Sequence, residues 1–160
     1  GLRYFNVYGP QENHEGKMAS MVFQMFNRWK AEGKVKLFEG IDGYGNGEQV
    51  RDFIYVKDVV KVNFFFWDHP ELKGIYNCGT GHAHTFNTLA KGVLKYFGSG
   101  ELEYVPFPEV LKGKYQSFTE ADSSKLLAAG YDGGFTDIEE AIAEYCALLD
   151  KNDGYLINER

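Results

Sequence analysis

Apolar residues recur along this chain with two periods, one typical of helices and the other typical of strands. Spacings of three and four residues, which place side chains on one face of a helix, predict helices over residues 18–32, 57–68, 86–97, 120–129 and 136–149. Short runs of β-branched and aromatic residues predict strands or extended segments over residues 1–10, 35–39, 50–56, 74–79, 102–108 and 114–119. Strands and helices therefore alternate, which indicates an α/β fold.

Residue types at the ends of the predicted helices support several of these boundaries. Gly33 and Gly98 stand where a left-handed C-cap is expected, and Thr85 precedes a helix as its N-cap. Thr136 begins a capping box at the start of the last helix. The helix over residues 57–68 is apolar almost all round, so we expect it to be covered on most sides.

The first ten residues run from Gly1 to Pro10 as a strand that enters a glycine-proline turn. Their composition is that of an inner strand, yet it includes Arg3 and Asn6, and polar groups inside a sheet must be paired. We therefore expect this strand to present Asn6 to a site. We also expect the strands that should flank it, and a region preceding Gly1, to lie outside this sequence.

The composition limits the class of protein. At 160 residues the chain can fold as one domain. Its net charge of -6 argues against binding to a nucleic-acid backbone, which needs a basic surface. No apolar stretch approaches the length of a membrane span, and no signal peptide is evident. Cys78 and Cys146 fall in patterns typical of small buried residues in a reducing compartment, so we expect a cytoplasmic protein without nucleic-acid or membrane partners.

Two clusters suggest ligands but lack part of the required pattern. Gly79-Thr80-Gly81 stands between a predicted strand and a predicted helix, yet the third glycine of a dinucleotide fingerprint is absent, which favours a tight turn. Cys78, His82 and His84 are the available metal ligands. No further Cys or His lies at motif spacing, so we expect no bound metal.

Basic residues next to aromatic ones favour a small anionic ligand with a flat ring. They are Lys17, Arg51, Lys112 and Lys114, close to Phe38, Tyr115 and Phe118. Each lysine alone can equally be a solvated surface charge. Arg51 interrupts an apolar strand, and its fork-shaped guanidinium can bind phosphate oxygens in a bidentate way. The competing interpretation is a structural ion pair of Arg51 with Asp52 or with a glutamate.

Three segments resemble motifs of one enzyme family. Residues 3–10, 51–59 and 76–81 are similar to the sixth-strand, substrate-domain and last-strand motifs of extended short-chain dehydrogenase/reductases that act on nucleotide sugars. A closer resemblance, to the branch that epimerises ADP-heptose, rests on residues 14–20, 36–40 and 104–116. The resemblance covers nearly the whole chain, whereas members of the family are about twice as long.

The resemblance implies a fold and a domain organisation. Residues 1–160 would form a single unit with the last strands of an NAD(P)-binding Rossmann fold and a nucleotide-sugar substrate-binding subdomain, without the N-terminal cofactor-binding half. The complete enzyme would be a cytoplasmic isomerase of lipopolysaccharide core synthesis and a homo-oligomer, a pentamer by family resemblance. Such enzymes hold NADP, which removes hydride from a sugar carbon and returns it to the other face. Residues 1–160 alone are expected to be inactive.

The resemblance also implies site residues. Val7 would contact the nicotinamide end of NADP. The ADP-sugar would be held by Asn6, Lys17, Gln24, Phe38, Glu39, Gly40, Ile41, Arg51 and Tyr115. The alternatives are another nucleotide-sugar epimerase or dehydratase of the same superfamily, and a non-catalytic nucleotide-sugar-binding module.

Epimerisation of this kind needs an acid/base group on each side of the reacting carbon. The family takes one, a tyrosine, from the half that this sequence lacks. For the other it uses a lysine in a His-Lys-Gly motif, where this chain has His14-Glu15-Gly16. Lys17 stands where a small polar residue is common in the family, and Gln24 where a histidine is common. Lys17 is the nearest amine, and we expect it to be the second acid/base.

Overall fold

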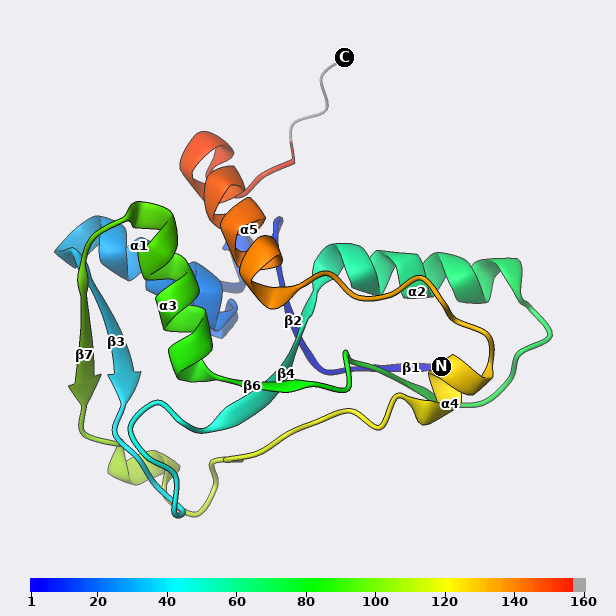
Figure 1. The fold of residues 1–160 in the computed structure, drawn as a ribbon, viewed down its shortest axis with the longest axis horizontal. Helices are drawn as coiled ribbons and strands as arrows, with labels where there is room; N and C mark the ends of the chain where they lie inside the picture. Colours follow the sequence, from blue (N-terminus) through cyan, green and yellow to red (C-terminus); the bar gives the residue numbers. More distant parts are fainter. Residues whose placement is uncertain (157–160) are drawn as a thin grey trace.

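A computed structural model describes residues 1–156 of the chain, and within them the strands form three small sheets (Figure 1). In the first sheet, β1 (Leu2–Tyr4) runs parallel to β5 (Tyr76–Cys78). In the third, β3 (Lys34–Phe38) runs parallel to β7 (Glu101–Val105). Helices connect the parallel strands, so the predicted α/β class is confirmed.

The second sheet has β4 (Val50–Tyr55) at its centre. β4 pairs in parallel with β2 (Asn6–Tyr8) and in antiparallel with β6 (Ala83–Thr85). The sequence pattern does not predict β6, because its three residues, Ala-His-Thr, show no alternation of apolar and polar side chains. This strand leads directly into the helix that forms one side of the candidate site described below.

The first ten residues change partner in the middle of the predicted single strand. The amide of Phe5 donates to Cys78 O at 3.1 Å, which ends the pairing of β1 with β5. From the next residue the chain pairs with β4, and Asn6 lies opposite Phe53. Asn6 therefore stands at the corner where the chain passes from one sheet to the other, with an exposed side chain.

α1 (Met21–Glu32) begins three residues later than the sequence period predicts. The hydroxyl oxygen of Ser20 accepts a hydrogen bond from Phe23 N at 3.3 Å, and this N-cap fixes the start of the helix. The residues before it form the 3-10 segment η1 (Asn13–Met18). The helix ends at Gly33, whose φ of 69° is the predicted left-handed C-cap.

α3 (Phe86–Phe97) confirms both of its predicted ends. The Thr85 hydroxyl oxygen accepts from Thr88 N at 3.1 Å, and Gly98 closes the helix with a φ of 67°. Figure 1 shows α1, α3 and the last helix gathered on one side of the molecule. Their apolar faces pack with residues of β2, β3 and β4 in the larger of two buried clusters.

The last helix, α5 (Ile138–Asn152), starts two residues later than predicted. Its N-cap is Asp137, whose carboxylate accepts from two backbone amides of the first turn at 2.9 and 3.3 Å. The predicted cap at Thr136 is therefore wrong. Thr136 instead donates its amide and its hydroxyl to the fully buried carboxylate of Asp58, at 2.8 and 3.0 Å.

α2 (Val56–Asp68) lies apart from the other long helices in Figure 1. Val60, Phe64 and Trp67 are 46%, 63% and 82% exposed. The prediction that this helix is covered on most sides is thus wrong within residues 1–156, because its outer apolar positions have no neighbour there. Its inner side packs on the smaller buried cluster, which contains Val62.

Two predictions near the end of the chain also need correction. In the described part, an isolated bridge to β4 replaces the edge strand predicted over residues 114–119. The helix predicted over 120–129 shortens to α4 (Ser124–Ala128), because Ala121 donates its amide to Asp52 at 3.0 Å and holds the preceding residues extended. One further 3-10 turn is η2 (Glu109–Leu111).

Both cysteines are buried and free of disulfide bonds, as the sequence predicts. Burial raises the pKa of the Cys78 thiol to about 11 and that of Cys146 to about 12. The two thiols are therefore protonated at neutral pH and act as small apolar side chains. None of the helices in the described residues has the length and apolar character that crossing a membrane requires.

Candidate functional site

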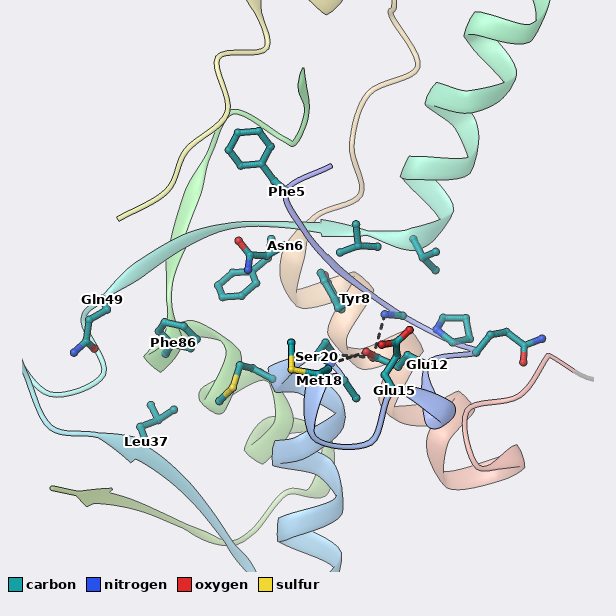
Figure 2. Close-up of a pocket in the computed structure, with 18 of the residues that line it drawn as sticks. Phe5, Asn6, Tyr8, Glu12, Glu15, Met18, Ser20, Leu37, Gln49 and Phe86 are labelled. Atoms are coloured by element: carbon teal, nitrogen blue, oxygen red, sulfur yellow. Dashed lines mark hydrogen bonds between the residues drawn. The ribbon is translucent and has the colours of Figure 1, made fainter. Parts of the chain in front are cut away.

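A cavity of about 690 Å³ opens between β2, the segment that follows it, the start of α1 and the end of β3 (Figure 2). Its walls are mostly apolar, and the side chains of Asn6, Tyr8, Met18 and Phe86 surround one space in Figure 2. The volume is that of a site for a small organic molecule.

Four of the predicted site residues line this cavity. They are Asn6, Val7, Phe38 and Tyr115. Glu39, Gly40 and Ile41 follow Phe38 in the loop from β3 to β4, just beyond the lining. The lining also includes Gln49, which is only 2% exposed and whose side-chain amide donates to Glu39 O at 3.3 Å. Sequence reasoning did not single out Gln49.

Arg51 lies behind two residues of the cavity wall. Its guanidinium carbon is 5.0 Å from the ring centroid of Tyr115 and 5.9 Å from that of Phe86. Nη1 donates to Val50 O at 2.9 Å, and the residue is 7% exposed. Burial lowers the pKa of Arg51 and raises that of Tyr115.

Arg51 forms no ion pair with any carboxylate of residues 1–156, and its neighbour Asp52 faces the other way. Successive side chains of a strand point to opposite faces, so Arg51 and Asp52 cannot meet on β4. The structural ion pair considered above is therefore excluded within the described chain. A buried guanidinium without a counter-charge has the donors and the charge to bind an anion such as phosphate.

Asp52 explains the Gly79-Thr80-Gly81 segment. Its fully buried carboxylate accepts from the amides of Thr80 at 2.8 Å and Gly81 at 2.9 Å, and from the Thr80 hydroxyl at 2.8 Å. A Cβ on Gly79 would lie 2.8 Å from the same carboxylate. The turn thus uses its amides to bind a side chain of the protein, and they are not free for a pyrophosphate. This confirms the tight-turn interpretation.

The carboxylate of Glu12 holds the segment from residue 12 to residue 20, which lines one side of the cavity. This carboxylate accepts from Ser20 N at 2.6 Å and from the Ser20 hydroxyl at 2.7 Å (Figure 2). It also accepts from the Tyr145 hydroxyl at 2.7 Å. The segment between Glu12 and Ser20 is therefore tied to both α1 and α5. Sequence reasoning missed Glu12, because its partner Tyr145 is 133 residues away along the chain.

Two candidate acid/base groups, Glu15 and Lys17, lie on the segment that Glu12 holds, and they differ in their position relative to the cavity. Glu15 lines the cavity, and His14 Nε2 lies 3.1 Å from its carboxylate. Lys17 is exposed and lies outside the lining, and its carbonyl oxygen accepts from Gln24 Nε2 at 3.2 Å. Gln24 donates also to Ala19 O at 2.7 Å, so its amide holds the segment and does not enter the cavity.

No group of three or more potential metal ligands occurs within the described residues. The predicted nicotinamide contact, Val7, lines the cavity next to Asn6. The residues present therefore suit the reactive end of a dinucleotide cofactor, whereas the amides of the Gly79-Thr80-Gly81 turn are occupied by Asp52.

Comparison with known proteins finds a family model, curated relatives and solved structures that this chain resembles. Residues 1–79 match the model of the "NAD dependent epimerase/dehydratase family". The chain is thus similar to that family over these residues. The chain is also 57% identical over 145 residues to the ADP-L-glycero-D-manno-heptose-6-epimerase of Alkalilimnicola ehrlichii, a match that covers 91% of this chain and 45% of that protein.

Solved structures of the family share the fold. The ADP-L-glycero-D-manno-heptose-6-epimerase of Helicobacter pylori is 32% identical, with a TM-score of 0.76, over 94% of this chain and 44% of that one. The UDP-glucose 4-epimerase of Thermus thermophilus, solved in complex with NAD, is 27% identical, with a TM-score of 0.73, over 94% of this chain and 46% of that one. The resemblance inferred from the sequence is confirmed. The chain spans about half the length of the curated relatives it matches.

Proposed function

We propose that this chain supplies the substrate-binding half of an NADP-dependent enzyme that converts ADP-D-glycero-D-manno-heptose to ADP-L-glycero-D-manno-heptose. One observation carries the proposal: Arg51 is buried without a carboxylate partner in the described chain and stacks on Tyr115, which lines a cavity large enough for a nucleotide sugar. High identity to heptose 6-epimerases supports this choice of substrate over other nucleotide sugars.

Each proposed contact follows from its place around the cavity. Arg51 binds the diphosphate beside the edge of Tyr115, whose ring stacks on the guanidinium and lines the ligand space. Phe38 and the loop residues Glu39, Gly40 and Ile41 surround the nucleoside. Asn6, at the corner between two sheets, holds the sugar through its exposed amide.

The proposed cofactor is NADP, which supplies reversible hydride transfer at the sugar carbon. Val7 contacts its nicotinamide end from the cavity wall. The second acid/base comes from the segment that Glu12 ties down. Glu15 is the favoured group, since its side chain lines the cavity, and Lys17, which the sequence resemblance predicts, is the competing one. Either side chain would exchange a proton with the sugar.

The proposed domain organisation treats residues 1–160 as one unit that completes a larger Rossmann fold. Within the described residues β1 pairs on one side only, with β5. Its other edge is available for a further parallel strand, which the remainder of the enzyme would supply together with the dinucleotide-binding loop. We propose a cytoplasmic homo-oligomer, a pentamer by family resemblance, for the complete enzyme.

Stereochemistry at the heptose C6 tests the proposed reaction. The complete protein is incubated with ADP-D-glycero-D-manno-heptose, and the configuration at C6 is followed by NMR. The proposal expects an equilibrium mixture of the two epimers without net consumption of NADP. Turnover of UDP- or dTDP-sugars, with no reaction of the ADP-heptose, would instead identify another epimerase or dehydratase of the superfamily. Binding of nucleotide sugar without any turnover would favour a non-catalytic module.

A further inference from the structure

The loop from β3 to β4 is held against the first turn of α3. Phe86 N donates to Gln49 O at 3.2 Å, and Asn87 N donates to Gly47 O at 3.0 Å. The loop approaches this turn so closely that a Cβ on Gly47 would lie 2.4 Å from Asn87 Oδ1, and the φ of Gly47 is +67°. Only glycine can occupy this position without displacing the loop.

The side chain of Asn87 satisfies three partners at once. Its Nδ2 donates to Asn46 O at 2.9 Å and to the carboxylate of Glu48. Its Oδ1 accepts from the hydroxyl of Tyr104, on β7, at 2.9 Å. Asn87 is 6% exposed, so the loss of any of these partners leaves a buried polar group unsatisfied.

The same loop has other bonds to Val105, whose carbonyl accepts from Glu39 N at 2.8 Å, and to Ser117, whose hydroxyl donates to Asp42 at 2.7 Å, and it is also tied to itself. Asn46 Oδ1 accepts from Gly40 N at 2.9 Å, and the loop amides of Tyr44 and Glu48 donate to carbonyls within the loop. Asn87 and Tyr104 therefore form the side-chain link between the loop and the rigid elements α3 and β7. Neither residue lines the cavity.

We propose that Asn87 is a positioning residue for the nucleotide-binding loop, and that Tyr104 orients its amide. Asn87 holds residues 39–49 in the conformation that surrounds the nucleoside, without touching the ligand. This inference rests on the proposed function, because it takes the loop to be the nucleotide contact. It predicts that nucleotide affinity depends on a side chain outside the cavity.

Two substitutions test the link with little change of shape. Asn87→Asp keeps the acceptor for Tyr104 but removes both donors and sets a carboxylate beside Glu48. Tyr104→Phe removes a single hydroxyl from a side chain that is 37% exposed. The matched control is Tyr96→Phe. Tyr96 lies on α3, as Asn87 does, but its hydroxyl donates to Asp150 of α5 at 3.4 Å, away from the loop.

Amide hydrogen exchange of residues 39–49 and the Kd for ADP are measured on the complete protein, together with the Kd for NADP. We expect Asn87→Asp to weaken ADP binding about 10-fold and Tyr104→Phe about 5-fold, the loss of one or two hydrogen bonds. Exchange of residues 39–49 should accelerate in both variants. The Kd for NADP and all values for Tyr96→Phe should stay unchanged, which a general loss of stability would not allow.

Two results would overturn this inference, and they are distinguishable. If ADP protects residues 39–49 from exchange in the wild type, but both variants keep wild-type exchange and affinity, Asn87 does not position the loop. If ADP leaves the exchange of residues 39–49 unchanged in the wild type, the loop is not the nucleotide contact, and the proposed binding mode fails together with the inference.

Discussion

The guanidinium of Arg51 stacks 5.0 Å from the ring centroid of Tyr115, and no carboxylate in residues 1–156 neutralises it. Tyr115 lines the cavity, so the positive charge lies one aromatic ring away from the ligand space. Its burial disfavours the charged form and lowers the pKa of Arg51. An anion bound beside Tyr115 would offset that cost.

Arg51→Ala should therefore weaken binding of the ADP-sugar by about 2 to 4 kcal/mol, the range for truncating one partner of a buried charge pair. The melting temperature should change little, because the protein loses an uncompensated buried charge. Calorimetric titration with ADP measures the first effect and thermal unfolding the second. Arg28→Ala, an exposed arginine on α1, is the control. An unchanged affinity with a large drop in melting temperature would make Arg51 a structural residue.

Asp52→Ala should have the opposite profile. It leaves the amides of Thr80, Gly81 and Ala121 without their buried acceptor, which should cost about 3 kcal/mol or more in the free energy of unfolding. Urea unfolding measures this cost, with the exposed Asp122 replaced by alanine as the control. A wild-type stability with lost ADP binding would show that Asp52 serves the ligand and not the turn.

The segment held by Glu12 offers a test of the second acid/base. Because Glu15 lines the cavity and Lys17 does not, we expect Glu15→Gln to lower kcat by about 100-fold, as removal of a positioned acid/base does. Lys17→Met should raise KM modestly and leave kcat nearly unchanged. Steady-state kinetics of both variants in the complete enzyme decide between them. A loss of kcat confined to Lys17→Met would assign the role to Lys17, as the sequence resemblance predicts.

The buried thiols should be unreactive and should make the fold sensitive to alkali. The Cys78 thiol has its pKa raised to about 11 from 9.0, so its thiolate is about 100-fold scarcer than in the unfolded chain. Thiol labelling at pH 8 should therefore be at least about 100-fold slower in native than in urea-unfolded protein. The unfolded thiol ionises first as pH rises, so stability is full below about pH 9 and falls toward pH 11. Rapid native labelling would show that Cys78 is accessible.

Much of the fold could be predicted from local patterns. The C-caps at Gly33 and Gly98 and the N-cap at Thr85 follow from residue types within one turn, and the structure has them where the pattern indicates. The helices α1 and α5 begin later than predicted, because Ser20 and Asp137 are their N-caps. Thr136 is held instead by Asp58 from a distant helix.

The candidate site was predictable only in part, because its geometry depends on contacts between distant segments. Strand alternation alone could have excluded an Arg51–Asp52 pair, since adjacent residues of β4 face opposite sides. By contrast, the contact of Glu12 with Tyr145 and that of Asn87 with Asn46 join segments 133 and 41 residues apart. The periodicity of the sequence does not indicate contacts between such distant segments. The positions of Glu15, Lys17 and Gln24 relative to the cavity therefore follow only from the structure.

Competition between ADP and UDP for the complete protein tests the central claim most directly, because the two nucleotides differ only in the base that the loop from Phe38 to Gln49 would contact. Both are titrated by calorimetry into the wild type and into Arg51→Ala. The account predicts that ADP binds at least about 10-fold more tightly than UDP, and that Arg51→Ala weakens both, since it removes the shared diphosphate contact. Tighter binding of UDP, or an affinity for both that is independent of Arg51, would contradict it.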